Sequence, residues 1–590
     1  MAGARSSLAA GDYSGARDQA LDAAKAAPGN PAAQLVLARA YLELGDGLAA
    51  DAVLTRAQSA GVPAARLRAF RAAARLLQGD VASALAEAAR ADPPDRVYAT
   101  RVRARALAAS GDAAAAQQLL AGAEDAGSLT DLGQIRFGIG DVGGAAEASA
   151  YALKADARNP AALTLQGQVV RSRYGLVAAL PWFQAALKQD PAYPPALLEY
   201  AATLGDAGRN REAVAAARRA LAASSAAVQP FYLMAVIAAR AGNMDLAKGM
   251  LDHAGDRLRD LPAALLLGGA VDAAQGHVEL AVSQWSQLLD RQPDNRVARR
   301  LMGAALLGSG DARGALDTLR PIVSRGDADS YALEIAARAA WLTGDRAGAA
   351  SFHDRAISGG RGGAGGIAPA STVATLSIDL ANAPGDPARV LALIRGLGAS
   401  GDLAGALDRA RGLAGALPGS AAAQLVLGDT LALAGRPAEA AQPYARAADL
   451  AFDEPTMLRL LDVFGRLGRG SDAARALALY VAQNPQSIAA QRIAGHWQAT
   501  AGDPIAAITN LERVREWVGH RYAAVLADLA LAYAAAGRGE VSRHYARAAY
   551  ALAPMSVEVV NAYAAALARV GDVDGARQLR EKAEALTKSG

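Results

Sequence analysis

The pattern of apolar and polar residues along the chain breaks and resumes at nearly regular intervals. In residues 37–57, "LARAYLELGDGLAADAVLTRA", apolar residues at helical spacing lead to Gly45-Asp46, and the helical pattern starts again directly after them. Glycine tolerates the left-handed backbone that ends a helix, and aspartate caps the helix that follows. The stretch therefore predicts two helices joined by a tight turn.

The same break recurs along almost the whole chain, mostly at steps of 33 to 35 residues. A fixed period of this size is typical of a solenoid built from helix-turn-helix repeats. One further unit lies between Gly140 and Gly208, and there Tyr174 holds the position of the break. We therefore predict seventeen units, of which sixteen break at Gly11, Gly45, Gly79, Gly111, Gly140, Gly208, Gly242, Gly276, Gly310, Gly344, Gly401, Gly435, Gly468, Gly502, Gly537 and Gly571.

Two other residue types recur at regular positions relative to the break glycine. Alanine stands five residues after the glycine in fourteen units, where a small side chain lets the second helix approach the first: Ala50, Ala84, Ala116, Ala145, Ala213, Ala247, Ala281, Ala315, Ala349, Ala406, Ala440, Ala473, Ala507 and Ala576. Proline is expected to stop the second helix of six units, at Pro28, Pro191, Pro293, Pro418, Pro485 and Pro554.

These features resemble the tetratricopeptide repeat family. The stretch "ALPWFQAALKQDPAYPPALLEYA", residues 179–201, has the residues that this family expects at Ala179, Phe183, Ala186 and Pro191. The resemblance covers nearly the whole chain and implies an all-α fold, a right-handed α-solenoid of about seventeen helix-turn-helix repeats. The unit from Gly111 to Gly140 is shorter than the family pattern, and many first-helix positions carry alanine where the family has a larger residue.

One interval is too long for a single unit. Between Gly344 and Gly401 lies "SGGRGGAGGIAPAS", a glycine run too flexible for a packed helix, followed by "TVATLSIDLANA", which suits one extra helix. A hinge and a passive insertion are both open interpretations. We expect three parts: an N-terminal array over residues 1–357, a Gly-rich joint over 358–386 and a C-terminal array over 387–590.

Composition narrows the class of protein. The 590 residues carry a formal net charge of +4, which is a weak case for nucleic-acid binding because phosphate backbones need concentrated cations. Aromatic residues make up only 5% of the chain, which suits closely packed helices more than one thick core. The absence of cysteine removes disulfides, thiolate metal sites and cysteine nucleophiles.

The chain shows no membrane-spanning pattern and an unusual start. No apolar run approaches the roughly 18 residues that cross a bilayer, and the first residues lack the apolar core of a signal peptide. Gly11 implies a first helix that would begin before residue 1. Two explanations stay open: a short, frayed helix, or a chain shortened from a precursor whose missing part carried a signal sequence or a lipid-bearing cysteine.

No motif points to catalysis, a metal or a cofactor. The six histidines form no metal-ligand pair. "GRGGAG" at residues 360–365 matches a dinucleotide-binding pattern formally, but no strand precedes it. We expect no catalytic residues, no cofactor and no metal site.

Candidate binding residues gather on the first helices of the units, which line the concave groove in the family. One predicted cluster contains Arg39, Arg66, Tyr98, Arg101 and Arg105. A second predicted cluster contains Arg300, Tyr331, Glu334, Arg338 and Trp341, with Arg492 and His496 further along. Arginine pairs bidentately with anionic groups and stacks on aromatic rings, so such clusters suit an extended peptide or an acidic polymer. A solvated helix face with ion pairs along the helix is the alternative.

We therefore expect a non-enzymatic scaffold that binds a partner protein or an extended peptide in its groove. Residues 34–61 are also similar to bacterial envelope repeat proteins that accompany exopolysaccharide secretion and PEP-CTERM sorting. This similarity implies a periplasmic or envelope location if a signal was removed, and a cytoplasmic one otherwise. An acidic-polysaccharide-binding export component and a cytoplasmic regulatory adaptor are the alternatives. The family's carboxylate clamp uses Lys and Asn, which do not recur at these positions.

Overall fold

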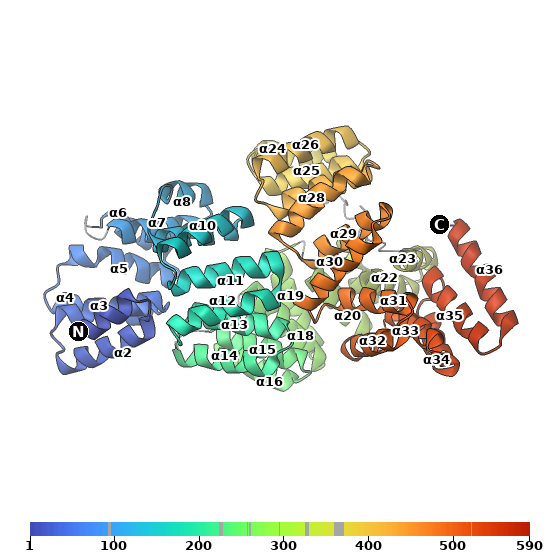
Figure 1. Ribbon diagram of the computed structural model, residues 1–590, viewed down its shortest axis with the longest axis horizontal. Helices are drawn as coiled ribbons and strands as arrows, with labels where there is room; N and C mark the ends of the chain where they lie inside the picture. The colour runs from blue at the N-terminus through green and yellow to red at the C-terminus, as the bar shows by residue number, and fades with distance from the viewer. Residues whose placement is uncertain are drawn as a thin grey trace. The chain divides into compact units, whose positions relative to one another are not determined.

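The computed structural model describes residues 1–91, 96–223, 228–255, 258, 261–293, 295–324, 328, 330–358, 371–520 and 522–589. Within these residues the regular secondary structure is entirely α-helical, in 35 helices (Figure 1). Seventeen consecutive pairs form helical hairpins, and α24 stands between the eleventh and twelfth pairs. The prediction of an all-α solenoid of about seventeen repeats is confirmed.

The first eleven hairpins follow one another from α1 to α23. In the order first helix, second helix, they are α1 (Ala2–Ala9) and α2 (Tyr13–Ala26), α3 (Pro31–Glu43) and α4 (Gly47–Ser59), α5 (Ala64–Leu77) and α6 (Val81–Ala89), α7 (Arg96–Ala109) and α8 (Ala113–Leu119), α9 (Ala126–Gly138) and α10 (Val142–Ala155), α11 (Pro160–Tyr174) and α12 (Leu176–Gln189), α13 (Pro194–Asp206) and α14 (Asn210–Ala223), α15 (Gln229–Arg240) and α16 (Met244–Ala254), α18 (Pro262–Ala274) and α19 (Val278–Arg291), α20 (Arg296–Gly308) and α21 (Ala312–Val323), and α22 (Ser330–Leu342) and α23 (Arg346–Ser358).

Helix α24 (Val373–Asn382) occupies the stretch that suited an extra helix. Residues 359–370, which hold most of the glycine run within the predicted joint of residues 358–386, lie outside the described residues. Six hairpins follow: α25 (Pro387–Ala399) and α26 (Leu403–Ala416), α27 (Ala421–Leu433) and α28 (Pro437–Leu450), α29 (Glu454–Arg466) and α30 (Gly470–Gln483), α31 (Ile488–Thr500) and α32 (Pro504–Val518), α33 (Ala523–Ala535) and α34 (Gly539–Leu552), and α35 (Val557–Arg569) and α36 (Val573–Ser589).

The breaks have the geometry that the sequence indicates. All sixteen predicted break glycines have φ between 68° and 95°, the left-handed region that glycine enters without steric cost. Aspartate then caps the next helix, as at Asp46, whose carboxylate accepts a 2.9 Å hydrogen bond from the Ala49 amide. The sixth unit differs from the prediction by one residue: Tyr174 is the last residue of α11, and the chain turns at Gly175 with φ 101°.

The repeated alanines and prolines do what their positions predict. All fourteen alanines five residues after the break are buried, none more than 6% exposed. Each of the six prolines follows the last residue of its second helix by two positions. The shortened unit has a second helix, α8, of only seven residues.

A second close approach between paired helices recurs in five hairpins. A glycine of the first helix faces a large side chain sixteen residues later, so close that an added Cβ would lie 2.4 to 2.7 Å from it. Real Cβ atoms do not come so near to other atoms, so these glycines set the spacing between the two helices. The pairs are Gly167 with Phe183, Gly269 with Trp285, Gly303 with Leu319, Gly428 with Tyr444 and Gly495 with Leu511.

The chain forms two compact units. Unit 1 contains Met1–Ala264 with the short segments Ala414–Gln424 and Arg446–Asp453, and unit 2 contains Leu265–Leu413, Leu425–Ala445 and Glu454–Gly590. In the part of the chain that is described, no helix is both long and apolar enough to cross a membrane.

Candidate functional site

The first helices of unit 1 form its inner layer. From α1 to α15, each odd-numbered helix contacts the next odd-numbered one directly, whereas the described parts of consecutive second helices make no contact of that extent. Since neighbours on the inside of a curved stack are closer than neighbours on the outside, the first helices line the concave side. Side chains from successive first helices can therefore meet there.

Four residues of the first predicted cluster meet on this inner layer. The Arg39 guanidinium of α3 lies over the ring of Tyr98 in α7, 3.8 Å from its centroid, and the Arg39 Nε donates a 2.7 Å hydrogen bond to Glu43. The Tyr98 ring is only 8% exposed. Arginine stacked on a tyrosine face is a favourable arrangement, so the predicted proximity of Arg39 and Tyr98 reflects a specific contact.

The other two arginines converge on one acidic side chain. The Arg101 Nε donates a 2.7 Å hydrogen bond to Asp131 of α9, and the Arg105 Nε lies 3.8 Å from the same carboxylate. The Arg105 Nε is buried and has no hydrogen-bond partner among the described residues. We call Arg39, Glu43, Tyr98, Arg101, Arg105 and Asp131 the N-terminal cluster.

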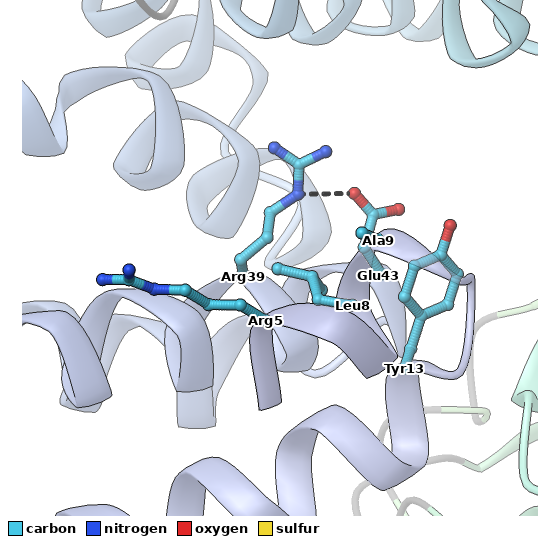
Figure 2. A pocket seen from close by; sticks show the side chains of 6 residues that line it. All are labelled: Arg5, Leu8, Ala9, Tyr13, Arg39 and Glu43. Atoms are coloured by element: carbon cyan, nitrogen blue, oxygen red, sulfur yellow. Dashed lines mark hydrogen bonds and ion pairs between the residues drawn. The ribbon is translucent and has the colours of Figure 1, made fainter. Parts of the chain in front are cut away.

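A pocket of about 250 Å³ adjoins the N-terminal cluster. Figure 2 shows the Arg39–Glu43 hydrogen bond at its edge, with Tyr13 beside Glu43 and with Arg5 and Leu8 contributed by α1. The pocket is smaller than the roughly 300–1,000 Å³ of most small-molecule sites. Its size suits a side chain more than a whole cofactor.

Electrostatics fix the charge states in the N-terminal cluster. Burial by itself would lower the pKa of Arg101, but Asp131 and Glu43 outweigh it, so the pKa is raised. Burial would raise the pKa of Glu43, but Arg39, Arg101 and Arg105 together lower it. Burial also raises the pKa of Tyr98. Arg101 is therefore cationic, Glu43 is anionic and Tyr98 is neutral throughout the physiological pH range.

Arg66 does not join the N-terminal cluster. It lies exposed near the start of α5 and takes part in none of these contacts. Arg66 precedes the buried Leu67, and neighbouring positions on a helix point in different directions.

The second predicted cluster, in unit 2, is more open. Arg300 lies over the Tyr331 ring, 5.8 Å from its centroid, which brings α20 and α22 together. Tyr331 and Trp341 are 57% and 61% exposed, Arg338 is also exposed, and Glu334 is half-buried. Trp341 contacts Arg346, whose guanidinium lies 5.4 Å from a Trp341 ring centroid.

Arg492 and His496 are both paired with Asp528. The Arg492 Nη1 lies 3.3 Å from one Asp528 oxygen, and the His496 Nδ1 lies 2.8 Å from the other. Asp528 belongs to α33 and is buried, so α31 and α33 are joined by this pair of contacts. A structural role accounts for both residues.

Sequence reasoning missed the acidic and amide partners on the inner layer. Glu43 and Asp131 bind the cluster arginines, and Gln168 of α11 accepts a hydrogen bond from Gln134 and donates one to Glu199. The sequence does contain a signal for the two glutamines, because Gln134 and Gln168 are 34 residues apart and so occupy the same position in consecutive repeats. The predicted clusters contain arginines and aromatic residues together with Glu334 and His496, and they include none of these partners. No group of three or more metal-binding side chains occurs in the described ranges.

Comparison with known families identifies the repeats in three stretches of the chain. A sequence model described as "Tetratricopeptide repeat" matches residues 1–66, 130–194 and 391–455. The chain contains tetratricopeptide repeats. The match of residues 1–66 includes Arg39 and Glu43, so these two side chains lie on tetratricopeptide repeat helices. No curated protein matches the sequence.

Solved structures with such repeats are similar to the chain. A chain of the APC/C hetero-tetramer Cut9-Hcn1 is 14% identical, with a TM-score of 0.38, covering 91% of this chain and 96% of that one. A tetratricopeptide repeat protein from Parabacteroides merdae is 16% identical, with a TM-score of 0.32, covering 40% and 92%. The human IFIT1 dimer with PPP-AAAA is 15% identical, with a TM-score of 0.36, covering 70% and 95%. At these scores the similarities carry no argument about this protein's ligand.

Proposed function

We propose that the protein is a non-enzymatic scaffold that binds an extended segment of a partner protein along the first helices of unit 1. The N-terminal cluster would hold an acidic group of that segment. One observation carries the proposal: Arg105 presents a buried Nε that has no hydrogen-bond partner among the described residues. Buried donors are normally satisfied, so a ligand oxygen would complete this group.

The chemistry of the N-terminal cluster supports an anionic ligand. Three guanidinium groups share two carboxylates, those of Glu43 and Asp131. Hydrogen bonds between guanidinium and carboxylate are charge-assisted and often bidentate. The adjoining pocket of about 250 Å³ suits one acidic side chain of the partner.

We place this function in the bacterial envelope, on the strength of the resemblance of residues 34–61 to envelope repeat proteins of exopolysaccharide systems. A peptide ligand is favoured over a polysaccharide because the pocket is small and Tyr98 is covered on the inner layer.

The test compares two arginines of one helix. Arg105→Ala removes the unsatisfied donor and leaves the Arg101–Asp131 hydrogen bond in place, and Arg103→Ala removes an exposed cation two positions away. Both variants and the native sequence would be used to capture proteins from envelope and cytosolic fractions. Captured proteins would then be divided into overlapping peptides, and the affinity of each peptide would be measured by fluorescence anisotropy.

We expect an acidic peptide whose affinity falls about tenfold in Arg105→Ala and stays unchanged in Arg103→Ala, since a hydrogen bond to a charged group contributes about 1.5–3 kcal/mol. Equal affinity in both variants would exclude the N-terminal cluster as the binding site. Retention of acidic polysaccharide without protein would replace the scaffold proposal by a polymer-binding one.

A further inference from the structure

The turn of the first hairpin contacts a segment that is 176 residues away in the sequence. The Ser14 amide donates a 3.1 Å hydrogen bond to Asp190, and the Ser14 hydroxyl donates a 2.5 Å hydrogen bond to the other oxygen of the same carboxylate. Asp190 directly follows α12, so the first hairpin is joined to the end of the sixth. All of these residues belong to unit 1.

Three further contacts join the first hairpin to hairpins six and seven. The rings of Tyr13 and Tyr193 lie 5.8 Å apart, and the Arg17 Nη1 donates a 3.0 Å hydrogen bond to the carbonyl of Ala223 at the end of α14. At Gly11, an added Cβ would lie 2.8 Å from the Cδ of Pro160, the first residue of α11. Unit 1 therefore closes on itself, from its first hairpin back to its middle.

This closure borders the pocket beside the N-terminal cluster. Tyr13 lines the pocket next to Arg39 and Glu43 (Figure 2), and it also packs on Tyr193. One residue thus belongs both to the closing contact and to the pocket wall. Separating the first hairpin from Tyr193 would remove part of that wall.

The closing contact has an apolar part, in which Tyr13 packs in one cluster with Leu163, Tyr193 and Leu197, and a polar part that depends on a buried anion. Asp190 is fully buried and accepts hydrogen bonds from the Ser14 amide, the Ser14 hydroxyl and the Ala192 amide. None of its described hydrogen bonds comes from a cationic side chain. A buried carboxylate without a counter-ion loses much of its hydration energy, so the polar part of the contact stabilises closure less than apolar burial of the same area would.

We propose that the first hairpin is a latch, whose release from Asp190 and Pro160 opens the inner layer of unit 1 to a ligand. The ligand is that of the proposed function, on which this inference rests. With the latch closed, the first hairpin forms one side of the pocket that Arg39 and Glu43 line. With it open, they are accessible from the side of the first hairpin.

Two glycines of nearly equal φ provide a matched pair of variants, one in the turn of the latch and one in the turn of the second hairpin. Gly11 has φ 79° and Gly45 has φ 80°, so alanine strains both turns to the same degree. Only at Gly11 does a Cβ meet another hairpin, whereas nothing lies within 4 Å of a Cβ at Gly45. Gly11→Ala should therefore open the latch, and Gly45→Ala should leave it closed. Ser14→Ala removes one latch hydrogen bond without altering any glycine.

The Ser14 amide reports the closed state by hydrogen exchange. It lies in the first turn of α2, where amides lack an acceptor within the helix, so Asp190 is its source of protection. The matching amide of the second hairpin is that of Leu48 in α4. We expect slow exchange at Ser14 relative to Leu48 in the native sequence. Gly11→Ala and Ser14→Ala should speed the Ser14 exchange about tenfold, and Gly45→Ala should not.

Access to the inner layer is measured in the same variants by labelling with phenylglyoxal, an arginine reagent. Labelling of Arg39 should accelerate in Gly11→Ala, while that of the exposed Arg66 stays constant. Fast Ser14 exchange in the native protein, or unchanged Arg39 labelling in an opened variant, would overturn the latch. Neither measurement needs a ligand, so failure of the latch and failure of the proposed binding function are distinguishable.

Discussion

Arg459 and Asp429 form two parallel hydrogen bonds between neighbouring repeats: Nε to Oδ1 at 2.6 Å and Nη2 to Oδ2 at 2.8 Å. The Tyr444 hydroxyl donates a third, 2.8 Å hydrogen bond to the same buried carboxylate. The two residues are thirty positions apart, on α29 and α27. Together with Arg101–Asp131, also thirty apart, this pair shows how polar side chains fasten one first helix to the next.

Removing Arg459 is expected to destabilise unit 2. Arg459→Ala leaves Asp429 buried, with the Tyr444 hydroxyl as its remaining donor among the described side chains, and breaking such a pair costs about 3 kcal/mol. Arg436 provides a matched control, because it binds Glu439 with the same two-bond geometry on an exposed surface. Arg436→Ala should change the urea midpoint little. Equal shifts in the two variants would mean that burial of Asp429 does not determine the strength of the contact.

Alanine in place of glycine should have opposite effects at two helical sites. In Gly167→Ala the new Cβ would lie 2.4 Å from the buried Phe183 ring, and overpacking of this kind costs about 1–3 kcal/mol. In Gly249→Ala nothing lies within 4 Å of the new Cβ, and the better helix propensity of alanine adds up to about 1 kcal/mol. Thermal unfolding of both variants checks the signs, and a stabilised Gly167→Ala protein would contradict the packing argument.

Two kinds of glycine differ in how well the sequence predicts their role. The break glycines and the alanines five residues later repeat in register, so period alone located the hairpins and their buried faces. The Gly167–Phe183 pairing also has a fixed spacing, of sixteen residues, but it occurs in only five hairpins as glycine with a large partner. Whether such a glycine is in close contact with its partner depends on the distance between the two helices, and the repeat period does not predict that distance.

The candidate site was predictable only in part. The period placed Arg39, Tyr98, Arg101 and Arg105 on first helices, and they do lie together. It could not show that Asp131 would pair with Arg101, since that depends on the offset between α7 and α9. The Ser14–Asp190 contact could not be predicted from the sequence, because it joins hairpins that are far apart in the repeat order and depends on the curvature of unit 1.

His496 should make the stability of unit 2 depend on pH. Its hydrogen bond to Asp528 raises the pKa of His496 above its ordinary value of 6.5, with further contributions from the Asp528 and Glu558 charges and opposition from burial and Arg492. A raised pKa means that the folded state favours the protonated form. The contribution is therefore complete below about pH 6.5 and is lost as the pH rises through the raised pKa.

The measurement is the urea midpoint between about pH 5.5 and about pH 8, for the native sequence and for His496→Gln. Because His496 is 43% exposed, the effect should be small, below about 1 kcal/mol. The native midpoint should fall toward alkaline pH more steeply than that of His496→Gln. Parallel curves would show that His496 contributes nothing to the pH dependence.

Alanine variants of Arg101 and Arg105 should differ in their effect on stability, since Arg101 has the structural contact and Arg105 the proposed role in binding. Arg101→Ala leaves Asp131, which is 7% exposed, without its hydrogen-bonded cation, so we expect a loss of about 3 kcal/mol in the free energy of unfolding. Arg105→Ala removes only a 3.8 Å contact and should cost under about 1 kcal/mol. Urea unfolding distinguishes the two, and Arg101→Lys should recover part of the loss by restoring the charge without the guanidinium geometry. A stable Arg101→Ala protein would mean that Asp131 finds Arg105 as its new partner. In that case the free energy of unfolding should fall by the full amount only when Arg101 and Arg105 are both replaced by alanine.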